Sequence, residues 1–143
     1  MSRITQEEFE QLAIYHVPFV GALGIRVEHI EAGKAIIRMP FREDFIRPGG
    51  TVSGPVQMAL ADLVMYAVVM SLIGRVELAV TTNLTCNFLR RPQPADLIGE
   101  GQILKLGKRL AVGEVVLYSE GDPSPVAHVT CTYSIPPTYD APD

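Results

Sequence analysis

The most constraining feature of the sequence is an almost uninterrupted apolar stretch from residue 55 to residue 73. A membrane-spanning helix needs about 20 such residues. However, Asp62 lies near the middle of the stretch, and an aspartate at a bilayer centre costs roughly 3 kcal/mol or more. No second apolar stretch and no flanking cluster of lysines or arginines accompanies it. We therefore expect a helix in the core of a globular domain, and no membrane partner.

Residues at the two ends of this stretch predict where the helix begins and ends. Ser53 suits the N-cap, where its hydroxyl can accept a hydrogen bond from a free N–H. Pro55 falls in the first turn, where a missing N–H is tolerated. Gly74 suits the C-cap. The helix is then about 20 residues, or roughly 30 Å, long.

Strand patterns lie on both sides of the helix in the sequence. They cover residues 24–31 and 34–41 before it, and 78–89, 96–106, 110–119 and 126–135 after it. In the segment 78–89 the residues alternate, so that Val80 is expected on the apolar face and Thr81 on the polar face. A helix that is apolar all round needs apolar partners on most sides. We predict an α+β fold in which a curved antiparallel sheet wraps the helix.

Length and composition limit the remaining possibilities. The 143 residues suit one domain, with a core over about 18–136, a helix over about 5–15 that Thr5 and Glu8 introduce as a capping box, and a loose tail at 137–143. The net charge of −4 argues against a nucleic-acid partner. Two cysteines and no signal-peptide pattern predict a cytoplasmic protein. The three histidines are scattered, so no metal site is expected.

Asp62 is the only charged residue between Arg47 and Arg75. Burial of a lone carboxylate is costly unless it is paired or hydrogen-bonded. Burial would also raise its pKa, which suits a general base or nucleophile near neutral pH. In the alternative interpretation, Asp62 lies on a face that meets solvent or a second subunit and has no chemical role.

Glycines surround the start of the same helix, at Gly49, Gly50 and Gly54. The free N–H groups of a helix N-terminus can stabilise an oxyanion when the backbone is accessible. In the alternative interpretation, the glycines only permit a tight loop. Further along, residues 75–109 contain six basic and three acidic residues, which suits either a phosphorylated ligand or an ordinary solvated face.

The segment from Arg47 to Asp62, RPGGTVSGPVQMALAD, resembles the signature of hotdog-fold acyl-CoA thioesterases of the phenylacetate-degradation (PaaI-like) type. Gly50, Gly54 and Asp62 match that pattern in type and spacing, and the similarity extends over about residues 18–136. The resemblance implies a hotdog fold with one helix wrapped by five or six antiparallel strands. It also implies homodimers, or tetramers built as dimers of dimers, with sites between subunits.

The resemblance assigns roles to particular residues. Asp62 is the general base or nucleophile, the Gly54 backbone N–H is the oxyanion donor, and Thr81, with Thr82 beside it, supplies a hydroxyl that helps to place the water. The expected contacts for the coenzyme A phosphates are Arg90, Arg91, Lys108 and Arg109. No cofactor is expected, because coenzyme A is part of the substrate.

Three residues depart from the family pattern. Arg47 replaces the usual asparagine, Ser53 the usual histidine and Pro55 the usual second glycine. Arg47 is a candidate for binding an anionic group, such as a carboxylated acyl chain. The sequence therefore leaves two main functions open: an acyl-CoA thioesterase, or a non-catalytic protein that binds acyl-CoA or an aromatic ligand. A hydratase of the same fold ranks last, because no histidine lies on the helix or its loop.

Overall fold

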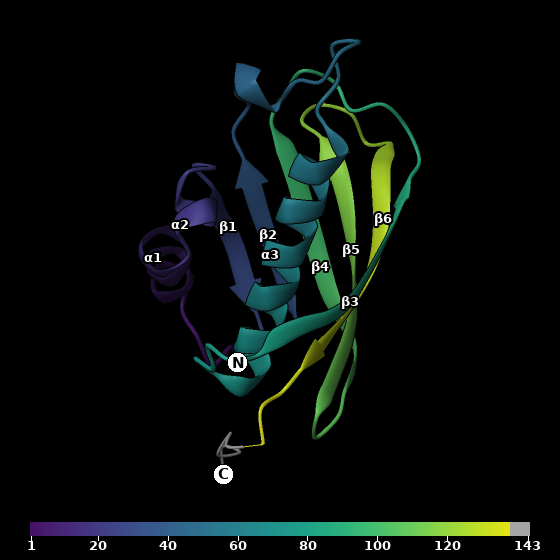
Figure 1. Cartoon of the computed structure of the whole chain (residues 1–143). Coiled ribbons are helices and arrows are strands. Elements are labelled where there is room, and N and C mark those ends of the chain that lie inside the picture. The colour runs from purple at the N-terminus through teal and green to yellow at the C-terminus, as the bar shows by residue number, and fades with distance from the viewer. Residues whose placement is uncertain (138–143) are drawn as a thin grey trace.

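Helix α3 (Gly54–Ile73) lies against the concave face of one six-stranded antiparallel sheet (Figure 1). This computed structural model describes residues 1–137, so the tail predicted from residue 137 lies outside the described residues except for Pro137. The sheet confirms the predicted α+β class and the hotdog architecture. Its six strands follow the spatial order β1-β2-β4-β5-β6-β3.

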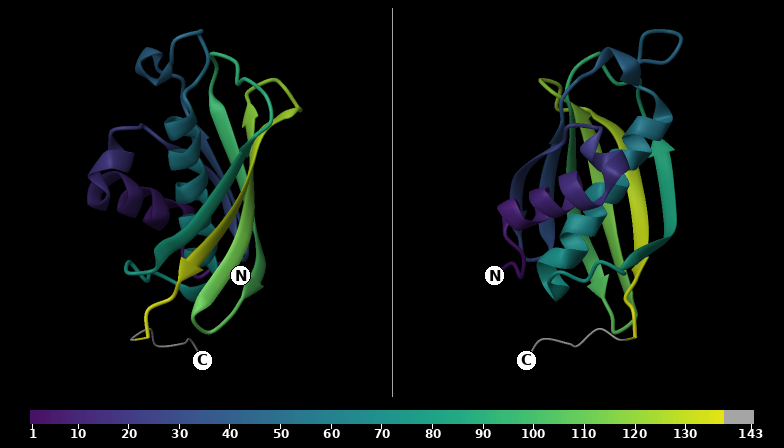
Figure 2. Two further views of the ribbon diagram at one scale, coloured as in Figure 1. Left: turned by 45° about the vertical axis from the view of Figure 1, so that its right-hand side comes forward. Right: turned by 60° about the vertical axis from the view of Figure 1, so that its left-hand side comes forward.

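The elements agree closely with the predicted segments. The strands are β1 (Arg26–Glu31), β2 (Lys34–Met39), β3 (Val80–Phe88), β4 (Leu97–Leu106), β5 (Leu110–Ser119) and β6 (Pro125–Ser134). The other helices are α1 (Gln6–His16), α2 (Pro18–Gly21) and the short 3-10 helix η1 (Glu43–Phe45). Helix α1 begins with the predicted capping box of Thr5 and Glu8. Helices α1 and α2 lie beside β1, at the side of the sheet opposite β3 (Figure 2).

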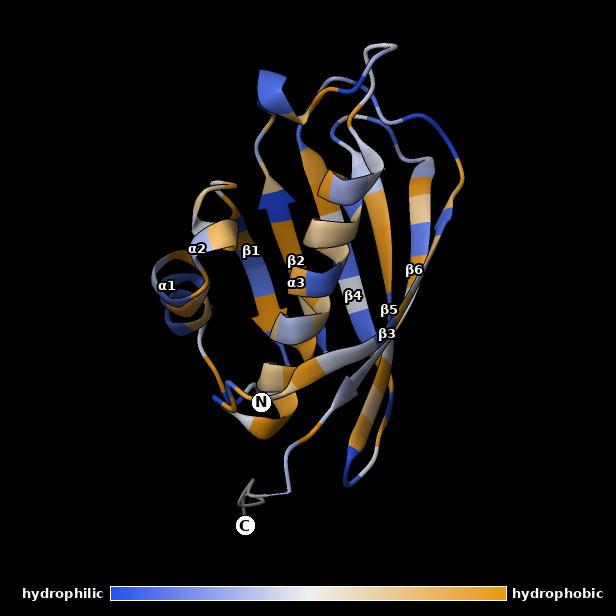
Figure 3. Cartoon of the chain, viewed as in Figure 1, coloured by the Kyte–Doolittle hydropathy of each residue, from blue (hydrophilic) through white to orange (hydrophobic). Residues whose placement is uncertain are grey.

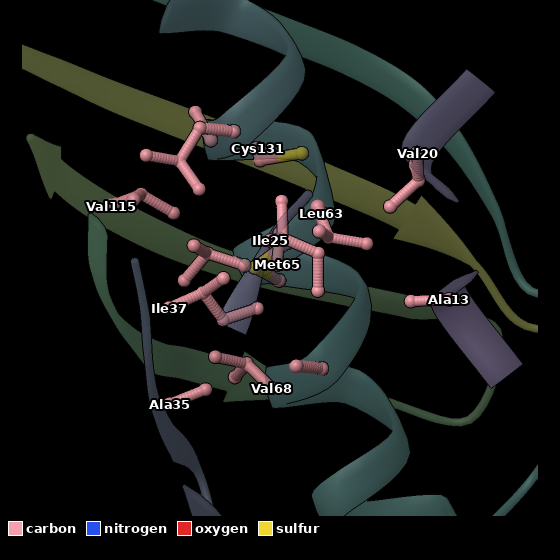
Figure 4. Packing of buried hydrophobic residues seen from close by; sticks show 14 of the residues in the cluster. Ala13, Val20, Ile25, Ala35, Ile37, Leu63, Met65, Val68, Val115 and Cys131 are labelled. Atoms are coloured by element: carbon pink, nitrogen blue, oxygen red, sulfur yellow. The ribbon is translucent and has the colours of Figure 1, made fainter. Parts of the chain in front are cut away.

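Close packing between α3 and the sheet depends on small residues in the strands. A Cβ atom at Gly101 would lie 2.6 Å from Val64, and one at Gly113 would lie 2.6 Å from Met65, so neither position has room for a side chain. Met65, Val68, Ile37 and Val115 meet in the layer between helix and sheet (Figure 4). The sheet therefore packs closely against α3, most of whose residues are apolar (Figure 3).

The ends of α3 lie where the sequence predicts them, but the N-cap works differently. Ser53 occupies the N-cap position without a side-chain hydrogen bond to the helix, so the expected capping by its hydroxyl is wrong. Pro55 in the first turn removes one of the N–H groups that a cap side chain normally reaches. Gly74 ends the helix with φ of 84°, a conformation that favours glycine.

Helix α3 is long and apolar enough to cross a membrane when judged by length and composition alone. In this fold, 67% of its most apolar window is buried inside the protein. Because it packs against β2, β4 and β5, α3 is the core helix of the domain.

A β-bulge in β3 breaks the alternation predicted for residues 78–89 at Val80 and Thr81, whereas the alternation from Asn83 to Phe88 is confirmed. The pairing of β3 with β6 shifts between Thr81 and Asn83, so Thr81 pairs with Tyr133 whereas Val80 pairs with Ser134. Because Tyr133 faces the core, Thr81 faces α3 and Val80 faces the opposite side of the sheet. The bulge therefore reverses the faces that strict alternation gives these two residues.

Candidate active site

Asp62 lies midway along α3, and its carboxylate reaches strands β3 and β6. The Thr81 hydroxyl donates a hydrogen bond to Asp62 Oδ1 over 2.6 Å. The Tyr133 hydroxyl lies 2.9 Å from the same Oδ1 and 3.0 Å from the Asp62 backbone carbonyl. Both donors are neutral, so the carboxylate is positioned by hydrogen bonds rather than by a counter-ion.

The second carboxylate oxygen of Asp62 has a different environment. Oδ2 accepts no hydrogen bond from any of residues 1–137, and it is not among the fully buried atoms that lack a partner, so it remains accessible. Within the same residues, no arginine, lysine or histidine forms an ion pair with Asp62. The half-buried side chain is thus available for chemistry through one oxygen.

The charge of Asp62 affects its titratable neighbours on β6. Burial, followed by the negative charge of Asp62, raises the pKa of the Tyr133 phenol well above its usual value. Burial and the same charge raise the pKa of the Cys131 thiol to about 12. Cys131 lies on β6 facing α3 (Figure 4). Both groups are therefore neutral near neutral pH, and neither competes with Asp62 as a charged group.

The start of α3 presents backbone N–H groups at the mouth of a cleft. No residue in the described part of the chain accepts a hydrogen bond from the Gly54 N–H, as is usual for a first-turn donor. Gly54 packs against Phe88, since a Cβ atom there would lie 3.3 Å from the ring. Gly49 and Gly50 have φ of 101° and 81° and shape the turn between Arg47 and Thr51. The role of Gly50 in this structure is thus to form the turn.

The cleft beside Gly54 has a volume of about 520 Å³ and combines apolar and cationic residues. Its apolar lining includes Val52, Phe88, Leu89 and Pro92, and its cationic lining consists of Arg47, Arg90 and Arg91. None of these three arginines pairs with a carboxylate of residues 1–137. The buried Gln57 also lines the cleft, and its Oε1 lacks a hydrogen-bond partner within that range. The cleft suits a ligand with an apolar body and an anionic group.

The structure does not bring all the predicted basic residues together within one chain. Arg90 and Arg91 lie beside the start of α3, whereas Lys108 and Arg109 occupy the turn between β4 and β5. That turn lies at the opposite end of the molecule (Figure 1). Strand β4 separates the two groups by ten residues, or about 33 Å.

Thr82 and Ser53 form no hydrogen bond with the Asp62 carboxylate. The Thr82 hydroxyl donates to the Thr132 backbone carbonyl over 3.2 Å, at the bulge. Ser53 contributes its carbonyl to the first turn, where it accepts from Gln57 N–H over 3.2 Å. Of the two neighbouring threonines, Thr81 and Thr82, it is therefore Thr81 whose hydroxyl reaches Asp62.

Tyr133 is the site residue that the sequence did not reveal. It lies 71 residues from Asp62 in the sequence and belongs to no motif, so the sequence alone does not predict its contact with Asp62. The alternation of Val129, Cys131 and Tyr133 along β6 is the available signal, because it places all three on the inner face. Among the described residues, no group of three or more His, Cys, Asp or Glu side chains could hold a metal ion.

Residues 49–134 match the family model of the thioesterase superfamily. The chain belongs to the thioesterase superfamily. The match includes α3 with Asp62, strand β3 with Thr81 and strand β6 up to Tyr133. The residues that surround the carboxylate therefore lie within the region that defines the superfamily.

Solved structures agree with this assignment. The chain is similar to a "putative thioesterase" from Silicibacter sp. TM1040, with 40% identity, a TM-score of 0.87 and coverage of 96% of this chain and 95% of that one. It is also similar to a mutant of the phenylacetic acid degradation protein PaaI from Thermus thermophilus, with 29% identity and a TM-score of 0.72 over 82% of this chain and 97% of that one. These relatives support the PaaI-like type of hotdog protein.

A sequence relative extends the comparison. A "putative esterase" of Saccharolobus solfataricus is 28% identical over 93 residues, which are 65% of this chain and 66% of that protein. The match thus covers slightly less than two thirds of the relative's length. The names of these relatives refer to the hydrolysis of thioesters in one case and of esters in the other.

Proposed function

We propose that this thioesterase-superfamily protein hydrolyses an acyl-CoA thioester, with Asp62 as the general base or nucleophile. The observation that carries the proposal is a carboxylate in the middle of an apolar helix, held by two neutral hydroxyl donors and paired with no cation among residues 1–137. A structural carboxylate in such a place is normally neutralised by an ion pair. An uncompensated one suits proton or acyl transfer.

The proposed reaction has two possible forms at the same atom. As a base, Asp62 takes a proton from water while the water oxygen adds to the thioester carbonyl. As a nucleophile, Asp62 adds to that carbon itself, and water then hydrolyses the resulting anhydride. In both forms the carbonyl oxygen becomes an oxyanion, which the Gly54 N–H stabilises. Cleavage of the C–S bond releases the coenzyme A thiolate, which takes up a proton, and the acyl group leaves as a carboxylic acid.

The positions of Gly54 and Asp62 support a site that is shared between two copies of the chain. Eight residues along a helix correspond to about 12 Å. A base about 3 Å from a carbonyl carbon and a donor about 3 Å from its oxygen are far closer together than that. The Gly54 N–H of one subunit therefore acts on the thioester that Asp62 of the other subunit attacks.

Strand β3 is the edge at which the second copy docks in this proposal. It lies at the end of the sheet and, among residues 1–137, pairs with β6 alone, so its other edge presents unpaired backbone groups. Apolar side chains are exposed along it and beside it, namely Leu78, Val80, Phe88, Leu89 and Met58. An exposed apolar edge of this kind is typical of an interface. A homodimer, or a tetramer made of two such dimers, would cover it.

The arginine-lined cleft gives the proposal its substrate class. Arg47, Arg90 and Arg91 offer three unpaired cations beside the start of α3, counted within residues 1–137. Arg90 and Arg91 suit a coenzyme A phosphate, and Arg47 suits a carboxylate on the acyl chain. Lys108 and Arg109 lie too far from these residues in one chain and would meet the same ligand only from the partner subunit.

Replacement of Asp62 by asparagine tests the proposed function. In a thiol-release assay over a panel of acyl-CoA substrates, Asp62→Asn should lose at least about 100-fold in turnover, the low end for a general base. Asp44→Asn is the matched control, because Asp44 is exposed and pairs with Arg42 away from α3. Unchanged turnover in Asp62→Asn would refute the role. Tight acyl-CoA binding by the native protein with no thiol release would instead support the non-catalytic binding function.

A further inference from the structure

The ring of Tyr133 is held firmly in the layer between α3 and the sheet. Tyr133 is the second-last residue of β6, and it is only 3% exposed. The ring stacks on Tyr66 of α3 with centroids 5.9 Å apart and an interplanar angle of 24°. Phe9 of α1 packs edge-on against Tyr66 at the same centroid distance. These contacts fix the direction in which the Tyr133 hydroxyl points.

The hydroxyl of Tyr133 acts as a donor at all working pH values. It has a single proton, which it shares between Asp62 Oδ1 at 2.9 Å and the Asp62 carbonyl at 3.0 Å. Burial and the charge of Asp62 raise the pKa of this phenol, so the proton stays on it. The contact to the helix backbone also fixes the tyrosine hydroxyl relative to the main chain of Asp62.

Two donors on one oxygen make the two oxygens of the carboxylate unequal. Thr81 and Tyr133 both reach Oδ1, and Oδ2 has no donor among residues 1–137. Hydrogen bonds to an ionised carboxylate stabilise the charged form and reduce the basicity of the oxygen that accepts them. The carboxylate also cannot rotate without breaking both bonds.

We infer that Tyr133 is a positioning residue that, together with Thr81, occupies Oδ1 and leaves Oδ2 as the oxygen of Asp62 that meets the water or the thioester. The inference rests on the proposed function for its catalytic meaning. The asymmetry of the carboxylate itself can be measured without any turnover.

The experiment measures the NMR chemical shift of the Asp62 carboxyl carbon at neutral pH, together with kcat and KM, in the Tyr133→Phe protein. Loss of the Tyr133 donor to Oδ1 should move this chemical shift away from its value in the native protein. Turnover should fall about tenfold while KM changes little, because the aromatic packing remains. Tyr118→Phe is the matched control, since Tyr118 lies on the outer face of β5.

A second variant keeps the inference testable if Tyr133→Phe fails to fold. Thr81→Val removes the other donor at similar volume and should also move the chemical shift of the Asp62 carboxyl carbon. If neither variant moves this chemical shift relative to the Tyr118→Phe control, the inference is wrong. That outcome is distinct from failure of the proposed function, which Asp62→Asn tests through turnover alone.

Discussion

Thr81 and Tyr133 face each other across strands β3 and β6, and both donate to Oδ1 of Asp62. The bulge between Thr81 and Asn83 makes this arrangement possible. Without it, alternation along β3 would turn the Thr81 hydroxyl to the outer face of the sheet. A local irregularity of one strand thus supplies half of the hydrogen bonds that hold the carboxylate.

The β3 edge should support dimer formation. Val80 is 52% exposed on this edge, and a lysine there would oppose strand pairing between copies. We expect Val80→Lys to shift the protein from dimer to monomer in sedimentation at micromolar concentration and to lose activity with it. Phe19 is an exposed apolar residue of α2 on the far side of the sheet, and Phe19→Lys should leave both the oligomeric state and the activity unchanged. A Val80→Lys protein that stays dimeric would place the interface elsewhere.

The sequence was sufficient to predict the elements of this fold because their signals are local. The ends of α3 are marked by Ser53 and Gly74, and Gly74 adopts the positive φ that makes glycine the suitable residue there. The all-round apolar character of α3 also required a sheet around it. Each of these inferences depends on neighbouring residues alone.

The site was only partly predictable because its contacts span the chain. Asp62 stood out as a single charge in an apolar stretch, but Tyr133 is 71 residues away and carries no motif. The direction of Thr81 depends on a bulge that exists only through pairing with β6. Grouping Arg90 with Lys108 by charge ignored the length of β4, which separates them. The contact of Tyr133, the direction of Thr81 and the separation of Arg90 from Lys108 all depend on tertiary structure, which a single sequence does not contain.

Arg47 should favour acyl chains that carry a carboxylate. Succinyl-CoA and butyryl-CoA have chains of equal length, so their ratio of kcat/KM isolates the carboxylate from the coenzyme A phosphates. Arg47→Gln should lower this ratio about tenfold, since a charge-assisted hydrogen bond is lost only for the acidic substrate. Arg42→Gln is the control, because Arg42 pairs with Asp44 and does not line the cleft. An equal loss for both substrates would assign Arg47 to the phosphates.

Glu114 on the outer face of the sheet should make stability depend on pH. His128 at 3.0 Å and Gln102 at 2.6 Å hydrogen-bond its carboxylate and hold its pKa below the usual value. A lowered folded-state pKa adds stability above the unfolded value and loses it as the pH falls through the folded value. Glu114→Gln should therefore lower Tm near neutral pH, and the difference should shrink below pH 4.5, the ordinary glutamate value.

The control for this measurement is Glu100→Gln. Glu100 is exposed on β4, and within residues 1–137 it forms no ion pair. Its replacement should leave the dependence of Tm on pH unchanged. Parallel Tm curves for the native protein and Glu114→Gln across the acidic range would contradict the assigned role of Glu114.

Two variants should separate the effect of the Gly54 N–H on turnover from the effect of a larger side chain at this position. Gly54→Ala retains the N–H and adds a Cβ in tight contact with Phe88, whereas Gly54→Pro also removes the N–H at a helix position that tolerates proline. Loss of an oxyanion donor should make Gly54→Pro about 100-fold or more slower than Gly54→Ala. Circular dichroism checks that both retain the helix. Equal turnover in the two variants would exclude this N–H from the reaction.

The central claim is that one site contains Asp62 of one subunit and the Gly54 N–H of the other, and mixing two inactive variants tests it most directly. Asp62→Asn and Gly54→Pro proteins are denatured together and refolded at equal concentration, and thiol release is measured. Random pairing makes about half of the dimers mixed, each with one intact site of two, so we predict recovery to about a quarter of the native activity. A mixture as inactive as its two components would contradict the claim.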